Sequence, residues 1–484
     1  MENLEEQGKK PAILAIAGAA VGHFMPVLHI TQHLISRGFD VTILQASYFK
    51  PQIEAIGAHF LALEKECDWC QYDLALAGSP EGKFPERLQL EPGLETLAYD
   101  LEHIFMPYIP AQARSIRKAV DHIRERTGRT GAHEVVILAE NSILGILPLR
   151  LVSDAKIAES KVPPVLGLNV VPLTFESVDV GPFGTGLPPD STPSGRARNQ
   201  MLHGLIRNFV LKNALKAMRR YMIEAGAEEE WVPKPGTEYM GFNITYHPRV
   251  YDKVLQMCGP QVEFPRSDLP SHIQFAGGLG RKAIPKDYQY PEWWQDIIAN
   301  ASLSPDDPRK KSIIVVSQGT FANNFNDLIL PTVAGMKDQN NILTVAILGK
   351  KGAVLKLGQH GLTELPSNAR VADFLLYDAI LPYADVWVQN GGYGGFQHGI
   401  ANAVPTVLAG VTEDKPEIAA RATWAGVGIS LGTGSPTPEQ VLKGVNEVLG
   451  NEKYKLRCEE LSKAMAEYNP LGRIEKELLA LANK

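Results

Sequence analysis

The order of apolar and polar positions predicts alternating strands and helices from the start of the chain. A short apolar run at residues 11–17 is typical of a buried strand, residues 26–37 carry apolar side chains at helical spacing, and residues 40–45 form a second apolar run. A loop that contains Gly18 and Gly22 separates the first strand from the helix. This order of strand, helix and strand is typical of a parallel, doubly wound sheet.

The same alternation continues along the chain in two blocks. In the first block, further strands are predicted at residues 134–139, 163–171, 239–246 and 272–276. In the second block, strands are predicted at residues 312–317, 341–348, 370–373, 384–388 and 406–409. The chain after Pro438 has a helical pattern. The predicted fold class is α/β, with two Rossmann-like, doubly wound parallel-sheet domains.

The chain is long enough for two domains. At 484 residues it exceeds what one hydrophobic core can organise. Proline, glycine and charged residues become frequent after residue 264, and this marks the boundary between the domains. We expect one domain at residues 1–278, a second at residues 279–450, and C-terminal helices at residues 451–484.

Two stretches of the first block show no clean period. Residues 48–100 mix short apolar runs with prolines, and we expect loops and helices there. Residues 181–198 are rich in glycine, proline and serine, so we expect an irregular segment of the kind that forms lids and binding loops, with a helix at residues 199–225.

Composition excludes several classes of partner. A net charge of −6 gives no electrostatic reason to expect nucleic acid or an anionic membrane. No apolar run approaches the roughly twenty residues of a membrane span. The four cysteines are too few and too scattered for a disulfide framework, so we expect a reducing compartment, the cytoplasm. Cys67 and Cys70 lack the second pair that a zinc site needs, and we interpret them as packing residues.

The strongest chemical signal lies after the strand at residues 384–388. Asn390, Gly391 and Gly392 follow that strand and precede a helical pattern. Glycines let the backbone approach a phosphate closely, and the free N–H groups at a helix start favour a diphosphate. An ordinary turn between a strand and a helix would also use two glycines.

The wider pattern resembles the nucleotide-sugar signature of family 1 glycosyltransferases, the UDP-glycosyltransferases. That signature has an aromatic residue for the base, a His-Gly-Gly turn, a carboxylate for the ribose, a Gly-x-Pro segment and an Asp-Gln pair for the sugar. Its places fall here on Phe374, Asn390-Gly391-Gly392, His398, Ala403-Val404-Pro405 and Asp414-Lys415. The chain departs from it: Phe374 replaces a Trp, Asn390 a His and Lys415 a Gln, and Gln397 or His398 stands where a Glu is usual.

Two further segments extend the resemblance. Gly22-His23-x-x-Pro26 is similar to the family's Gly-His-x-x-Pro, in which the His is the catalytic base, and imidazole has a suitable pKa for this task. The strand at residues 134–139 ends at Glu140, where the family has an Asp that orients the base; the neighbouring Asn141 is the alternative. Gln318-Gly319-Thr320 resembles the turn that contacts the donor phosphates.

The resemblance implies the GT-B fold, with the acceptor held by the N-terminal domain, the donor by the C-terminal domain, and terminal helices that cross back to the first domain. The catalytic residues would be His23 and Glu140. The residues that it assigns to the donor are Gly22, Gly319, Thr320, Phe374, Leu375, Asn390, Gly391, Gly392, Tyr393, Gly394, Gly395, Gln397, His398, Glu413, Asp414 and Lys415.

The implied enzyme is an inverting hexosyltransferase. We expect it to move glucose from UDP-glucose to a hydroxyl of a small lipophilic acceptor such as a phenol or flavonoid, or alternatively a sterol or hydroxy fatty acid. The chain has no Asp-x-Asp triplet, so neither a metal nor another cofactor is expected.

Other functions are compatible with the same fold. An epimerase would convert the donor without an acceptor, and a phosphorylase would need phosphate. A non-catalytic nucleotide-sugar-binding protein would retain donor affinity without turnover. A dehydrogenase is disfavoured because residues 18–22 lack the Gly-x-Gly-x-x-Gly spacing.

Overall fold

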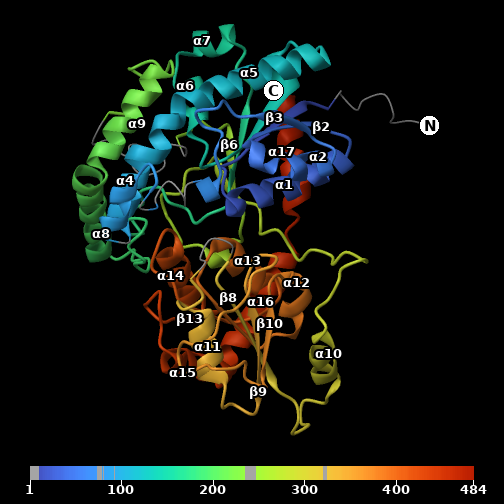
Figure 1. Cartoon of the computed structure of the whole chain (residues 1–484). Coiled ribbons are helices and arrows are strands. Elements are labelled where there is room, and N and C mark those ends of the chain that lie inside the picture. Colours follow the sequence, from blue (N-terminus) through green and yellow to red (C-terminus); the bar gives the residue numbers. More distant parts are fainter. Residues whose placement is uncertain are drawn as a thin grey trace.

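The computed structural model describes residues 10–73, 79, 81–91, 93–234, 247–319 and 324–483. Within these residues the chain forms two parallel sheets, one in each half (Figure 1). The prediction of two Rossmann-like parallel-sheet domains is therefore confirmed. The last strand of the first sheet ends at Phe275, and the first strand of the second sheet begins at Ser312.

The first sheet has seven strands among the described residues, in the spatial order β3-β2-β1-β4-β5-β6-β7. Their bounds are β1 (Ala12–Ile16), β2 (Asp40–Gln45), β3 (His59–Ala62), β4 (Val135–Glu140), β5 (Val165–Asn169), β6 (Lys253–Gln256) and β7 (Ile273–Phe275). After β3 the chain returns past β1 to form β4. The order of the strands reverses there, and such a point is where open parallel sheets bind their ligands.

The second sheet repeats this plan with six strands in the described part of the chain, in the order β10-β9-β8-β11-β12-β13. Their bounds are β8 (Ser312–Ser317), β9 (Ile342–Ile347), β10 (Ala369–Ala372), β11 (Val386–Gln389), β12 (Thr406–Leu408) and β13 (Gly428–Ser430). The reversal now falls between β8 and β11. Each sheet therefore offers one switch point, followed by loops at the carboxyl ends of two neighbouring strands.

Helices cover both sheets (Figure 1). Those of the first half are α1 (Val21–Ser36), α2 (Lys50–Ala55), α4 (Leu94–Asp100), α5 (Ile109–Thr127), α6 (Leu147–Arg150), α7 (Asp154–Glu159), α8 (Pro193–Leu205) and α9 (Lys212–Glu224), with a π-helical turn, η7 (Ile206–Val210), between the last two. Those of the second half are α10 (Trp294–Ser302), α11 (Ile329–Met336), α12 (Tyr377–Ile380), α13 (Tyr393–Ala401), α14 (Lys415–Ala425), α15 (Pro438–Leu449), α16 (Glu452–Ala466) and α17 (Pro470–Ala482).

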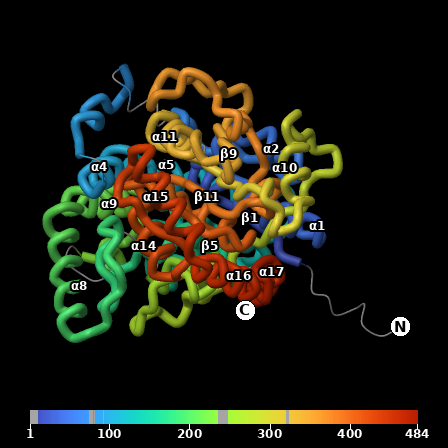
Figure 2. Tube along the Cα trace, turned by 90° about the horizontal axis from the view of Figure 1, so that it is seen from below, coloured from blue at the N-terminus to red at the C-terminus, as the bar shows by residue number. Residues whose placement is uncertain are grey.

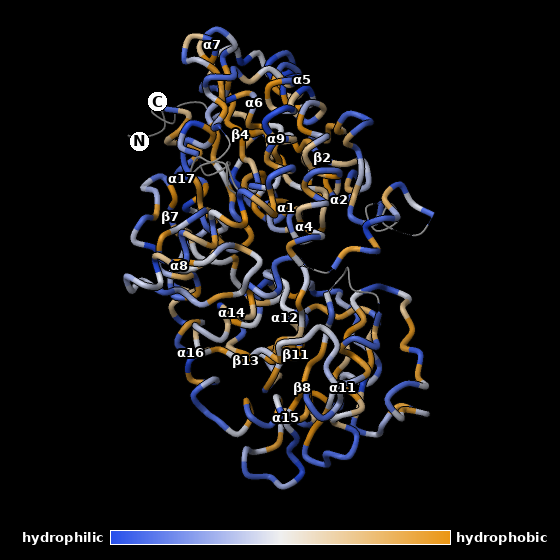
Figure 3. The backbone as a smooth tube through the Cα atoms, turned by 90° about the vertical axis from the view of Figure 1, so that its left-hand side faces the viewer, coloured by the Kyte–Doolittle hydropathy of each residue, from blue (hydrophilic) through white to orange (hydrophobic). Residues whose placement is uncertain are grey.

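The strands form the apolar interior of each domain. Strands β1 and β4 are buried along their whole length, and the apolar colour in Figure 3 gathers in the sheets of the two lobes. A parallel sheet with helices on both faces excludes water from both faces, and this explains why its strands are continuous apolar runs. Cys67 and Cys70 belong to the first core as free thiols, and burial raises the pKa of Cys67 to about 11.

Several predicted boundaries differ from the structure. The prediction of an irregular segment up to residue 198 is wrong from Pro193 onward, where α8 begins. Thr192 caps this helix, because its Oγ1 accepts the N–H of Gly195 at 3.1 Å, and Pro193 suits the first helical position. The short strands β3, β6 and β13 were not predicted. The strand expected at residues 239–246 lies outside the described residues.

The last helix leaves the second domain and packs on the first. Ile474, Leu478 and Leu481 of α17 join the core of the first sheet, whereas α16 packs with the second domain. The chain thus crosses between the domains a second time. This crossing lies beside the first one, because Tyr468 packs so closely on Gly277 that a Cβ at position 277 would overlap its side chain. Figure 2 shows α17 at the edge of the molecule, next to α16. None of the described helices is both long enough and apolar enough to span a bilayer.

The α17 contact yields a stability prediction. Leu478→Ala should lower the free energy of unfolding by about 2–5 kcal/mol, because Leu478 is fully buried and its truncation leaves a cavity. Leu456→Ala is the control: this side chain of α16 is 59% exposed, so the change should be within about 0.5 kcal/mol. Urea unfolding measures both variants. Equal effects would contradict the assignment of α17 to the core.

Candidate active site between the two domains

His23 and Glu140 meet at the switch point of the first sheet. His23 lies in the first turn of α1, directly after β1, and Glu140 is the last residue of the neighbouring strand β4. His23 Nδ1 is 2.9 Å from Glu140 Oε1, so Glu140, and not Asn141, bonds to the imidazole. An ionised carboxylate only accepts hydrogen bonds, so Nδ1 carries the proton and Nε2 keeps its lone pair in the neutral ring.

Burial and charge act against each other in this pair. Glu140 is fully buried, and the side chain of His23 is 31% exposed. Burial disfavours the imidazolium, but the charge and hydrogen bond of Glu140 and the charge of Asp414 outweigh it and raise the pKa of His23. Burial also disfavours the carboxylate, but His23, Ser142 and the N–H of Gly18 outweigh it and lower the pKa of Glu140.

The loop around the pair is closely fitted. The N–H of Gly18 donates to Glu140 Oε2 at 3.1 Å, and Ser142 Oγ donates to the same oxygen. A Cβ on Gly18 would overlap Ser142 Oγ, so a larger residue there would displace the Ser142 hydroxyl. Gln71 Oε1 accepts the N–H of Val21 at 2.9 Å and fixes the start of α1. These contacts hold the Glu140 carboxylate in place under the imidazole.

The second switch point holds the glycine turns. Strands β8 and β11 are neighbours, and Asn390 Nδ2 donates to the carbonyl oxygen of Gln318 at 2.6 Å. Gly319 and Gly391 have φ of 74° and 85°, a left-handed conformation that glycine adopts without strain. The structure thus brings Asn390, Gly391 and Gly319 together. Thr320 lies outside the described residues.

The N-terminus of α13 adjoins these turns. Its capping residue, Gly392, has no side chain with which to satisfy the first N–H groups of the helix. The N–H groups of Tyr393 and Gly394 therefore remain available to an anion. Gly395 packs against Gln389, and a Cβ at position 395 would overlap Oε1 of that glutamine. The side chain of Tyr393 is buried and points to the first domain.

Two donor candidates follow strand β10. Phe374 is 37% exposed, which leaves its ring open to a stacking partner, and Lys351 Nζ lies 5.8 Å from the ring centroid. Leu375 is 2% exposed and packs in the second domain, so only its backbone remains for a ligand.

His398 is held by an acid that the sequence analysis did not identify. Its Nδ1 lies 3.3 Å from Asp378 Oδ1, which also accepts from Asn402 Nδ2 at 2.9 Å. Burial opposes the charge of Asp378, but the hydrogen bonds from His398 and Asn402 outweigh it and lower its pKa to about 2. The ring of His398 also meets the ring of Tyr377 edge to face, at 5.8 Å. His398 therefore faces the segment that follows Phe374.

Gln397 lies apart from His398 on α13. A Cβ on Gly278 would come 2.5 Å from Gln397 Oε1, so this side chain faces the connection between the domains. The structure separates the two residues that were considered for the ribose position.

The loop after β12 lies near His23. Burial raises the pKa of Asp414 to about 6, although the charge of His23 opposes this shift. The charges of Asp414 and His23 act on each other's pKa, so the two groups lie near one another. Burial lowers the pKa of Lys415 to about 8, and its Nζ donates to Thr412 Oγ1 at 3.0 Å and to the Glu413 carboxylate. Glu413 and Lys415 therefore bind each other, whereas Asp414 is close enough to His23 for their charges to interact.

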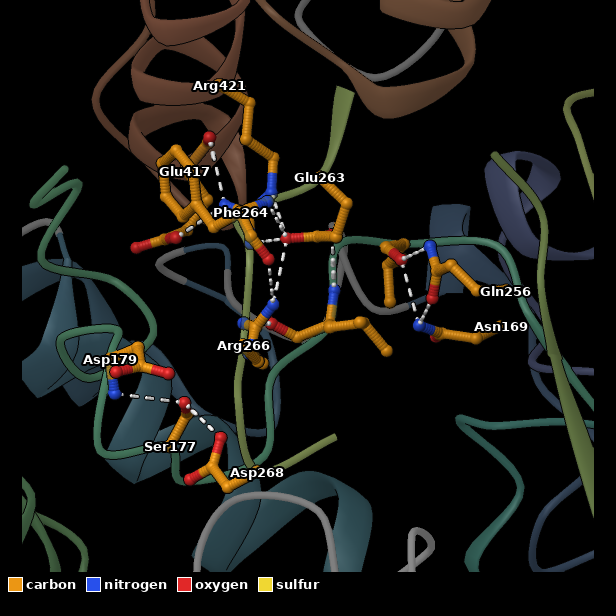
Figure 4. A network of polar contacts seen from close by, with 12 residues as sticks. Asn169, Ser177, Asp179, Gln256, Glu263, Phe264, Arg266, Asp268, Glu417 and Arg421 are labelled. Atoms are coloured by element: carbon orange, nitrogen blue, oxygen red, sulfur yellow. Dashed lines mark hydrogen bonds and ion pairs between the residues drawn. The ribbon is translucent and has the colours of Figure 1, made fainter. Parts of the chain in front are cut away.

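A buried ion network joins the domains beside this loop (Figure 4). Arg421 of α14 is fully buried, and its Nε and Nη2 donate to Glu263 Oε1 of the first half at 2.9 and 2.6 Å. Arg266 Nη1 donates to the same oxygen at 3.1 Å, and Arg421 Nη1 donates to Glu417 Oε2 at 2.8 Å. Burial opposes the charge of Glu263, but Arg421 and Arg266 outweigh it and lower its pKa.

Glu417 also holds a loop of the first domain. Its Oε1 accepts the N–H groups of Gly184 and Gly186, each at 2.9 Å. Nearby, Gln256 Nε2 of β6 donates to the hydroxyl of Tyr393 at 3.0 Å. The domains are thus joined by polar contacts whose members come from both sides.

The loop that Glu417 holds borders a hollow in the first domain. The hollow is shallow and adjoins α4, the loop at residues 174–183, and the segment from α8 to α9. The lining is mostly apolar and includes Leu94, Leu97, Phe183, Ile206 and Leu211. A mostly apolar lining of this kind suits contact with apolar groups of a ligand.

The fold and the site together define a GT-B glycosyltransferase. The solved structure of the glycotransferase of kitacinnamycin matches the chain with a TM-score of 0.66, at 17% sequence identity, over 98% of this chain and 100% of that one. At this identity the match shows the shared fold.

Sequence relatives give the family. UDP-glucosyltransferase 1 of Beauveria bassiana (strain ARSEF 2860) is 36% identical over 471 residues, 97% of this chain and 95% of the relative. UDP-glucosyltransferase A1 of Starmerella bombicola is 32% identical over 474 residues, 98% and 93% of the two chains. Residues 353–481 match the family described as Erythromycin biosynthesis protein CIII-like, C-terminal domain. The chain belongs to the family 1 UDP-glycosyltransferases and is a UDP-dependent glycosyltransferase.

The charged residues of the interface were not identified from the sequence. Glu263 directly precedes the segment interpreted as a domain boundary, and Arg421 is 158 residues further on. Side chains that meet across two domains leave no periodic signal. Asp378 was also missed. Its distance from His398 along the chain does not show that the two side chains would meet.

The ion network yields a second stability prediction. Arg421→Met should lower the free energy of unfolding by about 3–5 kcal/mol, because it leaves buried carboxylates without a partner. The control is Arg309→Met: Arg309 pairs with Asp307 on the surface and is 76% exposed, so its loss should cost at most about 1 kcal/mol. Urea unfolding measures both. A loss for Arg421→Met no greater than the control would contradict the network's role.

Proposed function

We propose that the enzyme transfers glucose from UDP-glucose to a hydroxyl group of a small lipophilic acceptor, with inversion at the anomeric carbon. Relatives named UDP-glucosyltransferase support glucose and uridine in the donor. The observation that carries the mechanism is the 2.9 Å contact of His23 Nδ1 with Glu140 Oε1, which leaves Nε2 free to act as a base.

In the proposed reaction His23 Nε2 takes the proton of the acceptor hydroxyl. The hydroxyl oxygen forms a bond to the anomeric carbon, and the bond from that carbon to the diphosphate oxygen breaks on the opposite side. The electron pair leaves with UDP, and attack from the opposite side inverts the configuration. Glu140 stabilises the imidazolium that forms.

The leaving diphosphate would bind at the start of α13. The N–H groups of Tyr393 and Gly394 and the helix dipole stabilise negative charge there, so this step requires no metal in our proposal. Asp414 would accept hydrogen bonds from the sugar hydroxyls, and Phe374 would stack on the base. Its neighbour Leu375 would contribute backbone contacts.

The acceptor would bind in the first domain. The apolar hollow beside residues 182–183 supports a phenol or flavonoid, and a sterol or hydroxy fatty acid remains the alternative class. The test incubates the enzyme with UDP-glucose and a panel of such acceptors. Mass spectrometry detects the glucoside, and NMR of the anomeric proton should show the β configuration. An α product would overturn inversion, and conversion of UDP-glucose without an acceptor would indicate an epimerase.

His23, the proposed catalytic base, should determine how kcat/KM falls at acid pH. Only neutral His23 accepts a proton, and its pKa is raised above 6.5, so kcat/KM should fall as the pH drops through this raised value. Glu140→Gln removes the charge that raises the pKa, and burial then lowers it, so the acid limb should move to lower pH while kcat falls. His23→Ala should lower kcat by about 10²–10⁴-fold and leave donor binding unchanged.

The control for this experiment is His33→Ala in the same helix, which should leave the profile unchanged. An acid limb that stays in place in Glu140→Gln would contradict the assignment of the limb to His23. Near-normal turnover of His23→Ala would remove this residue from the mechanism.

The ribose position should make the enzyme tolerant of thymidine nucleotides. His398 can offer the ribose a single hydrogen bond, since its other nitrogen is bound to Asp378. The ratio of kcat/KM for UDP-glucose to that for dTDP-glucose should stay below about a thousand, and His398→Ala should lower it further. Steady-state kinetics with both donors measures the ratio. A larger ratio, or one that His398→Ala leaves unchanged, would place the ribose contacts elsewhere.

A further inference from the structure

The helical segment from α8 through η7 to α9 has a charge unlike that of the rest of the chain. Residues 193–223 contain seven arginines and lysines and neither Asp nor Glu, in a protein whose net charge is −6. In Figures 1 and 2 this segment lies at the outer edge of the first domain. A basic helical segment that is also amphipathic is typical of surfaces that contact anionic lipid.

Large apolar side chains are exposed along this segment. Met201, Leu205 and Phe209 follow one another at intervals of four residues and are 60%, 45% and 75% exposed, and Val210 beside them is 38% exposed. Phe209 is the most exposed large hydrophobic side chain that the structure describes. The spacing of four places the first three along one face of the helix.

The opposite face of the segment already has a partner. Ile206 and Leu211 line the hollow, and Leu215, Met218 and Met222 of α9 belong to the first core. The fold is therefore completed without the outer apolar side chains. Exposed apolar residues in such a row indicate a contact with something outside the chain.

The basic residues divide into two groups. Four of them pair with acids of the same domain: Arg196, Arg198, Arg207 and Arg219. Lys212, Lys216 and Arg220 are exposed, are spaced by four along α9, and form no ion pair with any residue that the structure describes. Their charge is available to an anionic surface next to the apolar row.

We propose that this face rests on an anionic lipid bilayer. Phe209, Leu205 and Met201 would enter the boundary between headgroups and acyl chains, while Lys212 and Lys216 would bind lipid phosphates. A symmetric dimer through the same face would bring two basic segments together, which disfavours a second copy. One consequence rests on the proposed function: a lipophilic acceptor dissolved in the bilayer would lie next to the hollow, which the inner face of the segment lines.

Vesicle flotation tests the contact without reference to activity. The full chain should float with vesicles of phosphatidylcholine mixed with phosphatidylserine, and less with phosphatidylcholine alone. Added salt should weaken the binding, because it screens exposed charges. Phe209→Asp should lower the bound fraction at least about tenfold. Reversal of Lys212 and Lys216 to Glu should lower it more than about tenfold, since each basic residue contributes roughly a factor of five.

Matched variants in the second domain serve as controls. Val354→Asp replaces a side chain that is 74% exposed, and the pair Lys443→Glu and Lys453→Glu makes the same change of charge on α15 and α16. These controls should float like the unmodified chain. Circular dichroism should show unchanged melting for all variants, and this separates lost binding from lost folding.

Three results would overturn the proposal. The chain could fail to float with either kind of vesicle, or the controls could lose binding as much as Phe209→Asp does. Analytical ultracentrifugation could instead show a dimer that Phe209→Asp dissociates, which would make the face an interface between copies. Glucosylation of a water-soluble acceptor by Phe209→Asp should stay normal, so failure of the membrane contact remains distinct from failure of the proposed function.

Discussion

The geometry of the site depends on a charge that has been removed from water. Arg421 is fully buried, and a buried guanidinium needs acidic partners. Its partners come from both halves of the chain, Glu263 from the first and Glu417 from the second. Glu417 is three residues after Asp414 and also holds the backbone at Gly184. The same contacts therefore set the spacing of the domains and the position of Asp414 near His23.

The central part of the architecture could be predicted because parallel sheets follow a simple rule. The carboxyl ends of neighbouring strands lie at one edge, so a histidine after one strand and a glutamate at the end of the next can meet. His23 and Glu140 do so, at 2.9 Å, although Glu is longer than the aspartate usual in the family. Position 398 shows where the rule stops. A glutamate there would lie against Asp378 and repel it, so the departure at His398 has a physical cause that spacing along the chain cannot show.

Other features were missed because their causes are not local. Strand β6 is four residues long, and its apolar pattern is too short to distinguish from a loop. The start of α8 depended on the Thr192 cap within a stretch whose composition indicated a loop. Glu263 and Arg421 are far apart in sequence and become neighbours only when the domains meet. Composition, averaged over the whole chain, also concealed the basic segment of α8 and α9.

The two crossings between the domains limit how the enzyme can move. The chain passes from one domain to the other at Gly277 and returns near Tyr468, and these residues are in contact. Two adjacent tethers act as a pivot: the domains can swing apart about this point with backbone rotation confined to a few residues, while sliding or twisting would stretch one tether. In Figure 1, α14 lies toward the left of the interface and α17 further to the right. Opening for product release would thus start where Glu417 holds Gly184 and Gly186, and the side with the tethers would move least.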